Sequence, residues 1–282
     1  MIPWPIKIAA KIVLSRLPVP YSFWSRLNLF KLGLMADPEY AERVFLEHFA
    51  QFDRTRSPEG FTCLELGPGD SLLSAVVAHK HGSTRTYLID VGTFAEQDVQ
   101  AYRAAASRLL ETGNGGGMPD DWASVEDMLK SCNATYLTRG LASLSGLPSE
   151  SVDFIWSQAV LQHVRRADFL PLLEQTRRVL RKGGVASHLI DLRDHLGGKL
   201  NNLRFSEQVW EGKLFSRSGF YTNRYRYSEI LRMCQDAGFS VRATRCDLWP
   251  EIPTQRSAMA APFRRFDEDE LRIHGFYLTL TR

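Results

Sequence analysis

The sequence has few cysteines, little net charge and no long hydrophobic run, and each absence excludes a class of protein. Its four cysteines, scattered over 282 residues, show neither metal-site spacing nor a disulfide framework, which fits a reducing cytoplasm. A net charge of +3 is too small to indicate nucleic-acid binding by itself. No run of about 18 uncharged apolar residues occurs, so we expect no membrane-spanning helix. The remaining composition, 44% hydrophobic and 24% charged, is that of an ordinary globular protein.

Acidic residues are also absent from residues 1–36, which carry five lysines or arginines among many apolar and aromatic side chains. A basic, aromatic-rich helix can lie at a membrane interface, where anionic lipid attracts it. A pair of helices can instead cap a cleft with its apolar face buried. We expect residues 1–52 to form an N-terminal helical cap, with a peripheral membrane contact through residues 1–36 as the second hypothesis.

The rest of the chain, residues 53–282, alternates short apolar runs with helical patterns. This alternation is typical of a parallel sheet with helices on both faces. Residues 196–228 and 249–270 depart from it, and we expect them to form excursions at the edge of the sheet that binds ligands. Seven strands are predicted, at Thr62–Leu66, Thr86–Asp90, Thr135–Thr138, Val152–Trp156, Gly184–Asp191, Ser240–Asp247 and Gly275–Thr281.

The most specific signal is the stretch TCLELGPGDSLLSAVVAHKHGSTRTYLIDVG, residues 62–92. An apolar run there ends in Glu65, and a glycine turn, Gly67–Ser71, follows it. Glycines at a strand end let the backbone approach a ligand closely, because a side chain would block that approach. Asp90 ends the next apolar run, where a carboxylate can accept hydrogen bonds from both hydroxyls of a ribose. The stretch therefore predicts a nucleoside-binding strand–turn–helix–strand unit.

A missing glycine separates two classes of cofactor. A dinucleotide fingerprint requires G-x-G-x-x-G, but Leu72 stands where the third glycine would be. Glu65, just before the turn, is also unfavourable for a pyrophosphate because like charges repel. A cofactor with an ammonium group and no phosphate suits an acidic loop better. S-adenosylmethionine is such a cofactor.

Four motifs in order carry a resemblance to a known family: ELGPGDS, LID, SVDFIWSQAVLQHV and VLRKGGVASHLIDL. Over roughly residues 52–192 the chain resembles the class I S-adenosylmethionine-dependent methyltransferases. The resemblance implies a Rossmann-like α/β fold with a seven-stranded, mostly parallel sheet. It also implies a methionine pocket shaped by the glycine turn, and a ribose held by Asp90. Leu141 replaces the acidic residue that the family often carries near adenine. The expected cofactor-binding residues are Glu65, Gly67, Gly69, Asp90, Leu141, Ser157 and Gln158.

The end of the fifth strand, His188 to His195, carries the candidate catalytic residues. Methylation of an alcohol requires the acceptor to be positioned and its proton removed. We predict that His195 is the general base, since an ordinary histidine pKa of about 6.5 lies near working pH. Asp191 or Asp194 would orient its ring. Alternatively, Asp194 caps a helix and His195 is a solvated loop residue. A divalent metal held by these residues is possible but less favoured, because strand alternation divides them.

The fourth strand lacks the Asn/Asp-Pro-Pro-Tyr/Phe motif of methyltransferases that act on planar amino groups, which favours an oxygen acceptor. Residues 215–227, FSRSGFYTNRYRY, interleave aromatic residues with arginines. Aromatic faces stack on sugar rings, and arginine binds phosphate or carboxylate through two hydrogen bonds. His163 is more typical of a packed or capping residue than of a base. The predicted acceptor contacts are Arg217, Tyr221, Asn223 and Arg224.

The runs HLIDLRDHLGGKLNNLRFSE, residues 188–207, and GFYTNRYR, residues 219–226, also resemble, more loosely, methyltransferases of bacterial surface-polysaccharide pathways. We therefore predict O-methylation of a sugar hydroxyl on a glycan or glycolipid precursor, with no nucleic-acid partner. Lipid-linked glycans lie at the inner face of the cytoplasmic membrane, which would suit a cytoplasmic enzyme with a basic amino terminus. Two alternatives remain open: a small-molecule or natural-product O-methyltransferase, and a catalytically silent methyltransferase-like partner subunit.

Overall fold

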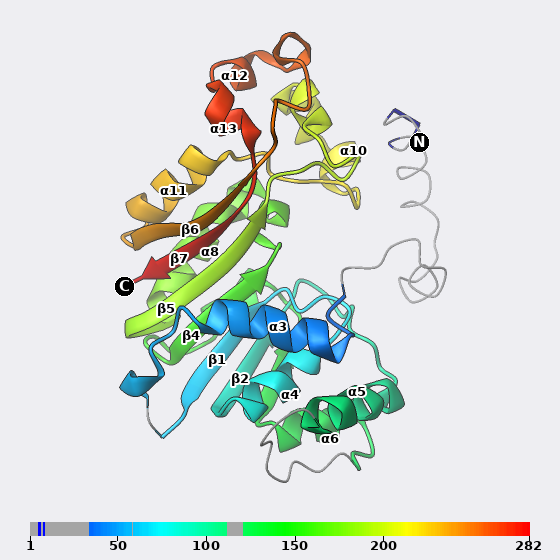
Figure 1. Ribbon diagram of the computed structural model, residues 1–282, viewed down its shortest axis with the longest axis vertical. Coiled ribbons are helices and arrows are strands. Elements are labelled where there is room, and N and C mark those ends of the chain that lie inside the picture. Colours follow the sequence, from blue (N-terminus) through cyan, green and yellow to red (C-terminus); the bar gives the residue numbers. More distant parts are fainter. Residues whose placement is uncertain (1–4, 7, 9–33, 58, 112–120) are drawn as a thin grey trace. The chain divides into compact units, whose positions relative to one another are not determined.

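The computed structural model describes residues 5–6, 8, 34–57, 59–111 and 121–282 (Figure 1). It has an α/β fold with a seven-stranded sheet in the order β3-β2-β1-β4-β5-β7-β6. β1 pairs in parallel with β2 and β4, and β2 pairs in parallel with β3. All seven predicted strands are confirmed, as is the mostly parallel sheet. The strands are β1 (Phe61–Leu66), β2 (Ser83–Ile89), β3 (Ala134–Leu137), β4 (Val152–Gln158), β5 (Leu180–Asp191), β6 (Ser240–Leu248) and β7 (Ile273–Thr281).

The helices connect these strands and build the two predicted excursions. The described α-helices are α3 (Pro38–Phe49), α4 (Leu73–Lys80), α5 (Val99–Glu111), α6 (Val125–Ser131), α7 (Leu141–Ser145), α8 (Arg166–Val179), α9 (Glu207–Trp210), α10 (Lys213–Ser216), α11 (Tyr227–Asp236), α12 (Ala261–Arg264) and α13 (Glu268–Arg272). Single 3-10 turns are η1 (Arg54–Arg56), η2 (Leu161–His163), η3 (Asn201–Arg204) and η4 (Arg256–Ala258).

The chain forms two compact units, each presented here by itself. The first unit holds the described residues of Met1–Val19, Ala159–Pro171 and Leu189–Leu278. The second unit holds those of Pro20–Gln158, Leu172–His188 and Thr279–Arg282. The predicted cap of residues 1–52 stays a prediction, because most of residues 1–33 lies outside the described residues. The same holds for the proposed membrane contact of residues 1–36.

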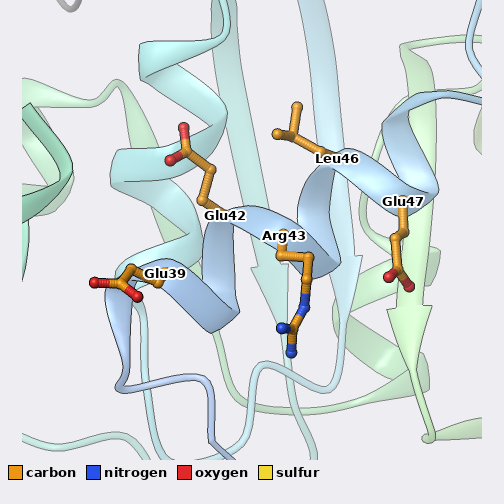
Figure 2. A pocket seen from close by; sticks show the side chains of 5 residues that line it. All are labelled: Glu39, Glu42, Arg43, Leu46 and Glu47. Carbon is orange, nitrogen blue, oxygen red and sulfur yellow. The ribbon is translucent and has the colours of Figure 1, made fainter. Parts of the chain in front are cut away.

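Helix α3 is fixed in the second unit by its start and its buried face. Asp37 caps the helix by accepting a hydrogen bond from the Tyr40 backbone N–H at 2.9 Å, and Pro38 occupies the first helical position. Phe45 packs edge-on against Trp156 of β4 with a centroid distance of 5.9 Å. α3 also contacts α4 (Figure 1). A surface pocket along α3 (Figure 2) is lined by Glu39, Glu42, Arg43, Leu46 and Glu47.

The turn after β1 adopts a conformation that requires its glycines. Gly67 and Gly69 have φ of 71° and 70°, in the left-handed region that side chains disfavour. The Gly67 N–H donates to the Ile89 carbonyl at 2.8 Å, which closes the turn against the end of β2. The sequence pattern around residues 62–92 therefore folds locally as predicted, into strand, turn, helix and strand.

In the first unit, the two excursions bury their own apolar side chains. Trp210 is fully buried, and its indole N–H donates to the Thr222 carbonyl at 2.7 Å. Around it pack Ile8, Leu196, Phe215, Phe220 and Tyr221. A second cluster joins the excursions through Leu200, Leu203, Met259, Phe263 and Leu271. Among the described helices, none is long and apolar enough to cross a bilayer.

Candidate functional site

The carboxylate of Asp90 is held at the end of β2 by two backbone groups. Its Oδ1 accepts from the Val91 N–H at 2.7 Å, and its Oδ2 accepts from the Gly69 N–H at 3.0 Å. The side chain is only 9% exposed, and burial raises its pKa. Each carboxylate oxygen keeps a further lone pair. Asp90 thus presents fixed acceptors beside the glycine turn, which suits a ribose diol.

Glu65 lies inside the second unit behind the glycine turn. It is 2% exposed, and the Ser74 hydroxyl of α4 donates to its Oε2. Burial raises the pKa of Glu65 to about 8, so the neutral acid predominates at neutral pH without a ligand. A cationic ligand nearby would favour the carboxylate. An ammonium- and sulfonium-bearing cofactor therefore fits this turn better than a pyrophosphate.

The other expected cofactor residues follow β3 and end β4. Leu141 begins α7 after Gly140, whose N–H donates to the Asp90 carbonyl at 2.7 Å. Ser157 is fully buried, and its hydroxyl lies 2.8 Å from Nδ1 of His188. Gln158 is the last residue of β4 and stays partly exposed. These contacts bring the predicted cofactor residues to one end of the second unit, while their roles in binding stay predictions.

A buried histidine missed by the sequence reasoning contacts this group. His48 of α3 is 0% exposed; its Nδ1 lies 2.8 Å from the Ser187 hydroxyl and its Nε2 lies 3.0 Å from Oε1 of Gln158. Burial lowers the pKa of His48 to about 4 and that of His188 to about 3, so both rings are neutral at neutral pH. The available signal was the place of His48 on the apolar face of α3, next to Val44 and Phe45.

In the first unit, the two predicted carboxylate partners of His195 have other contacts. Asp191 accepts from Arg193 at 2.8 Å and 2.9 Å. Asp194 is 3% exposed and accepts three backbone N–H groups. The donors are Leu196 at 2.8 Å, Gly197 at 2.6 Å and Asn201 at 2.5 Å. Asp194 therefore fixes the loop backbone and the first residue of η3, whereas the alternative expected it to cap a helix.

The ring beside His195 is that of His163. The two Nε2 atoms lie 3.3 Å apart, and the rings stack with a centroid distance of 4.9 Å and a 16° tilt. His163 Nδ1 lies 3.0 Å from the Tyr221 carbonyl, which can only accept, so this nitrogen carries the proton of the neutral ring. Its Nε2 is then an acceptor for His195 Nε2–H. Desolvation lowers the pKa of His163 and favours this neutral form.

Three of the four predicted acceptor contacts are buried in the first unit. The Tyr221 hydroxyl donates to Glu211 at 2.9 Å, and the Asn223 amide donates to the Leu161 carbonyl at 2.8 Å. Arg224 Nη1 donates to the Phe205 carbonyl at 2.7 Å, and burial lowers the pKa of Arg224 to about 10. The fourth residue, Arg217, is exposed. Within the described residues no cluster of three or more histidine, cysteine or acidic side chains has metal-binding geometry.

Comparisons with known proteins bear on one part of the chain and on the fold. A family model described as a methyltransferase domain matches residues 121–187. A proposed O-methyltransferase from Nostoc punctiforme has a similar structure, with a TM-score of 0.50, 11% identity and coverage of 99% of this chain and 68% of its own. A S-adenosylmethionine-dependent methyltransferase from Mesorhizobium loti has a TM-score of 0.43 and 18% identity, covering 81% of this chain and 95% of its own. No curated protein matches the chain.

The domain match, the sheet order and the glycine turn together define a methyltransferase domain of the Rossmann-like kind. The domain match covers residues 121–187 and agrees with the resemblance of the chain to the class I S-adenosylmethionine-dependent methyltransferases. The cofactor of the chain is S-adenosylmethionine, and the enzyme transfers the methyl group of that cofactor to an acceptor.

Proposed function

We propose that this enzyme methylates a hydroxyl oxygen, with a sugar hydroxyl of a glycan or glycolipid precursor as the leading acceptor. The observation that supports an oxygen acceptor is the stacked pair of His195 and His163. An alcohol must lose its proton during methylation, whereas an amine often needs only a neutral lone pair. An exposed imidazole with a fixed neighbour supplies a proton acceptor of the required kind.

In this proposal different residues bind the cofactor and remove the proton of the acceptor. When bound, S-adenosylmethionine supplies a methyl group on a positively charged sulfur, which is a good leaving group. Asp90 and the glycine turn hold the nucleoside and methionine ends. His195 removes the acceptor hydroxyl proton, and its Nε2–H then donates to the neutral Nε2 of His163, which stabilises the protonated ring. The Tyr221 carbonyl, 3.0 Å from His163 Nδ1, keeps His163 in the required tautomer.

An exposed arginine and a neighbour's description also support the proposed acceptor class. The similar structure from Nostoc punctiforme is described as a proposed O-methyltransferase, which supports oxygen over nitrogen. Exposed Arg217 is available to bind an acidic group of the acceptor. We further propose a peripheral position at the inner membrane face, supported by the five basic and no acidic residues among residues 1–36.

A methyl-transfer screen tests this proposal. Purified enzyme is incubated with S-adenosylmethionine labelled in its methyl group and with three acceptor panels: free and lipid-linked glycans, phenols, and primary amines. We expect labelled product from the glycan panel, with transfer that rises with pH as the base loses its proton. Label transferred to phenols alone would favour the small-molecule alternative, and label on amines would contradict the oxygen acceptor.

A further inference from the structure

The two ends of the Gln158 amide have different surroundings. Its oxygen Oε1 lies 3.0 Å from Nε2 of buried His48, whereas its nitrogen makes no hydrogen bond with the described residues. Gln158 is partly exposed, while His48, which contacts it, is 0% exposed, and Ser187, which contacts His48, is 1% exposed. One end of the amide is therefore fixed by the protein, and the other end is available to a ligand.

The protonation of His48 decides which end faces the ligand. The ring is neutral because burial lowers its pKa to about 4, so it has one N–H donor and one acceptor nitrogen. An amide oxygen can only accept, and therefore Nε2 of His48 carries the proton. Its Nδ1 then accepts from the Ser187 hydroxyl at 2.8 Å. The hydrogen bonds run in one direction, from Ser187 through His48 to Gln158, and leave the Gln158 NH₂ group as a donor.

This donor lies beside the glycine turn. β1 and β4 are parallel neighbours, and their register places Glu65 opposite Trp156. Two residues beyond this pair, Gln158 is the last residue of β4 and Gly67 is the first residue after β1. Ligands of open α/β sheets bind at the carboxyl ends of the strands, where both residues lie.

We infer that His48 is a positioning residue that turns the Gln158 amide so that its NH₂ group donates to the carboxylate of the cofactor's methionine end. The inference rests on the proposed placement of that end at the glycine turn. The methionine end carries a carboxylate, which needs donors, and an ammonium, which needs acceptors. With its oxygen bound to His48, Gln158 can serve only the carboxylate. A residue of the predicted cap thus controls a contact of the methyltransferase core.

Substitutions at His48 test the inference by their selectivity between two ligands. His48→Phe keeps a ring of similar shape without nitrogens, and His48→Gln restores an N–H near the position of Nε2. The matched control is His81→Phe, because His81 stacks on Phe45 at 5.6 Å, as His48 packs on Trp156 at 5.3 Å, but its ring nitrogen contacts Glu42 and not Gln158. Affinities are measured by calorimetry for S-adenosylhomocysteine and for 5′-methylthioadenosine, which has no carboxylate.

We expect His48→Phe to weaken S-adenosylhomocysteine binding about tenfold or more, the effect of losing an oriented hydrogen bond to a charged group. Its affinity for 5′-methylthioadenosine should stay within about twofold of wild type, and His48→Gln should recover most of the loss. Adding His48→Phe to Gln158→Leu should cause no further loss, because both act through one contact. Equal weakening of both ligands, or additive losses, would overturn the inference. Wild-type protein that binds neither ligand would instead refute the cofactor placement itself.

A measurement on the unmodified enzyme covers the case in which His48→Phe does not fold. Nitrogen-15 NMR of the histidines should show His48 with Nε2 protonated and Nδ1 unprotonated at neutral pH. The Gln158 NH₂ resonances should shift with S-adenosylhomocysteine and stay unchanged with 5′-methylthioadenosine. The opposite His48 tautomer would turn the amide oxygen toward the ligand and contradict the inference.

Discussion

The buried acid Glu65 should make the ligand-free enzyme less stable as the pH rises toward 8. In the folded state its pKa is raised to about 8 from an ordinary 4.5, chiefly by burial. The folded protein therefore keeps the Glu65 proton over a range in which the unfolded chain has lost it. Stability falls with rising pH wherever the folded state binds more protons than the unfolded state.

The magnitude follows from that difference in protonation. One proton retained only in the folded state changes the free energy of unfolding by about 1.4 kcal/mol per pH unit. Below pH 6.5 the buried His48 and His188 act in the opposite sense. Their pKa values are lowered in the folded state, so the unfolded chain binds protons that the folded protein does not, and stability rises with pH up to about 6.5. Between pH 6.5 and 8, Glu65 alone of these three should lower stability, by about 2 kcal/mol in total.

Urea unfolding of wild type and Glu65→Gln at several pH values in this window provides the assay. Glutamine keeps the shape and an acceptor for Ser74 but cannot ionise, so its curve should lack the Glu65 slope. Parallel curves for the two proteins would refute the argument that burial keeps Glu65 protonated. Because a cationic ligand favours the carboxylate, S-adenosylmethionine binding near neutral pH should also release a proton in wild type and none in Glu65→Gln. Calorimetry in buffers of different ionisation enthalpy measures that release.

Three further substitutions separate catalysis, stability and cofactor binding. His195→Ala should lower turnover by about 10²-fold with nearly unchanged cofactor affinity, and equal turnover in steady-state assays would remove it as the base. Asp194→Ala should destabilise the fold by about 2–4 kcal/mol in urea unfolding, because three backbone N–H groups lose their acceptor; a loss below about 0.5 kcal/mol would contradict that role. Asp90→Ala should weaken S-adenosylmethionine binding about tenfold or more by calorimetry, whereas unchanged affinity would exclude Asp90 from the ribose site.

The strand–turn–helix–strand unit could be predicted because its determinants are local. Apolar runs of strand length mark β1 and β2, and the backbone at Gly67 and Gly69 needs the left-handed conformation that glycine adopts most readily. Asp90 follows directly from its place at the end of an apolar run. The position of each of these residues depends only on neighbours in the sequence or on the adjacent strand.

The histidine contacts could not be predicted in the same way, because they join distant parts of the chain. His48 and Gln158 are 110 residues apart, and His163 and His195 are 32 apart. Alternation along β5 does not reveal that Asp194 turns back to bind loop N–H groups instead of the His195 ring. Interleaved aromatic residues and arginines are equally compatible with a binding surface and with a buried structural cluster. Only its burial in the structure shows that Arg224 belongs to such a cluster, where it donates to the Phe205 carbonyl.

Titration of the purified, ligand-free enzyme with S-adenosylmethionine, followed by calorimetry, tests the central claim most directly. The account predicts one site per chain with an affinity in the micromolar range, competed by S-adenosylhomocysteine and unchanged by a chelator. Failure of freshly prepared, folded protein to bind either ligand would contradict the assignment of the glycine turn and Asp90 as the cofactor site.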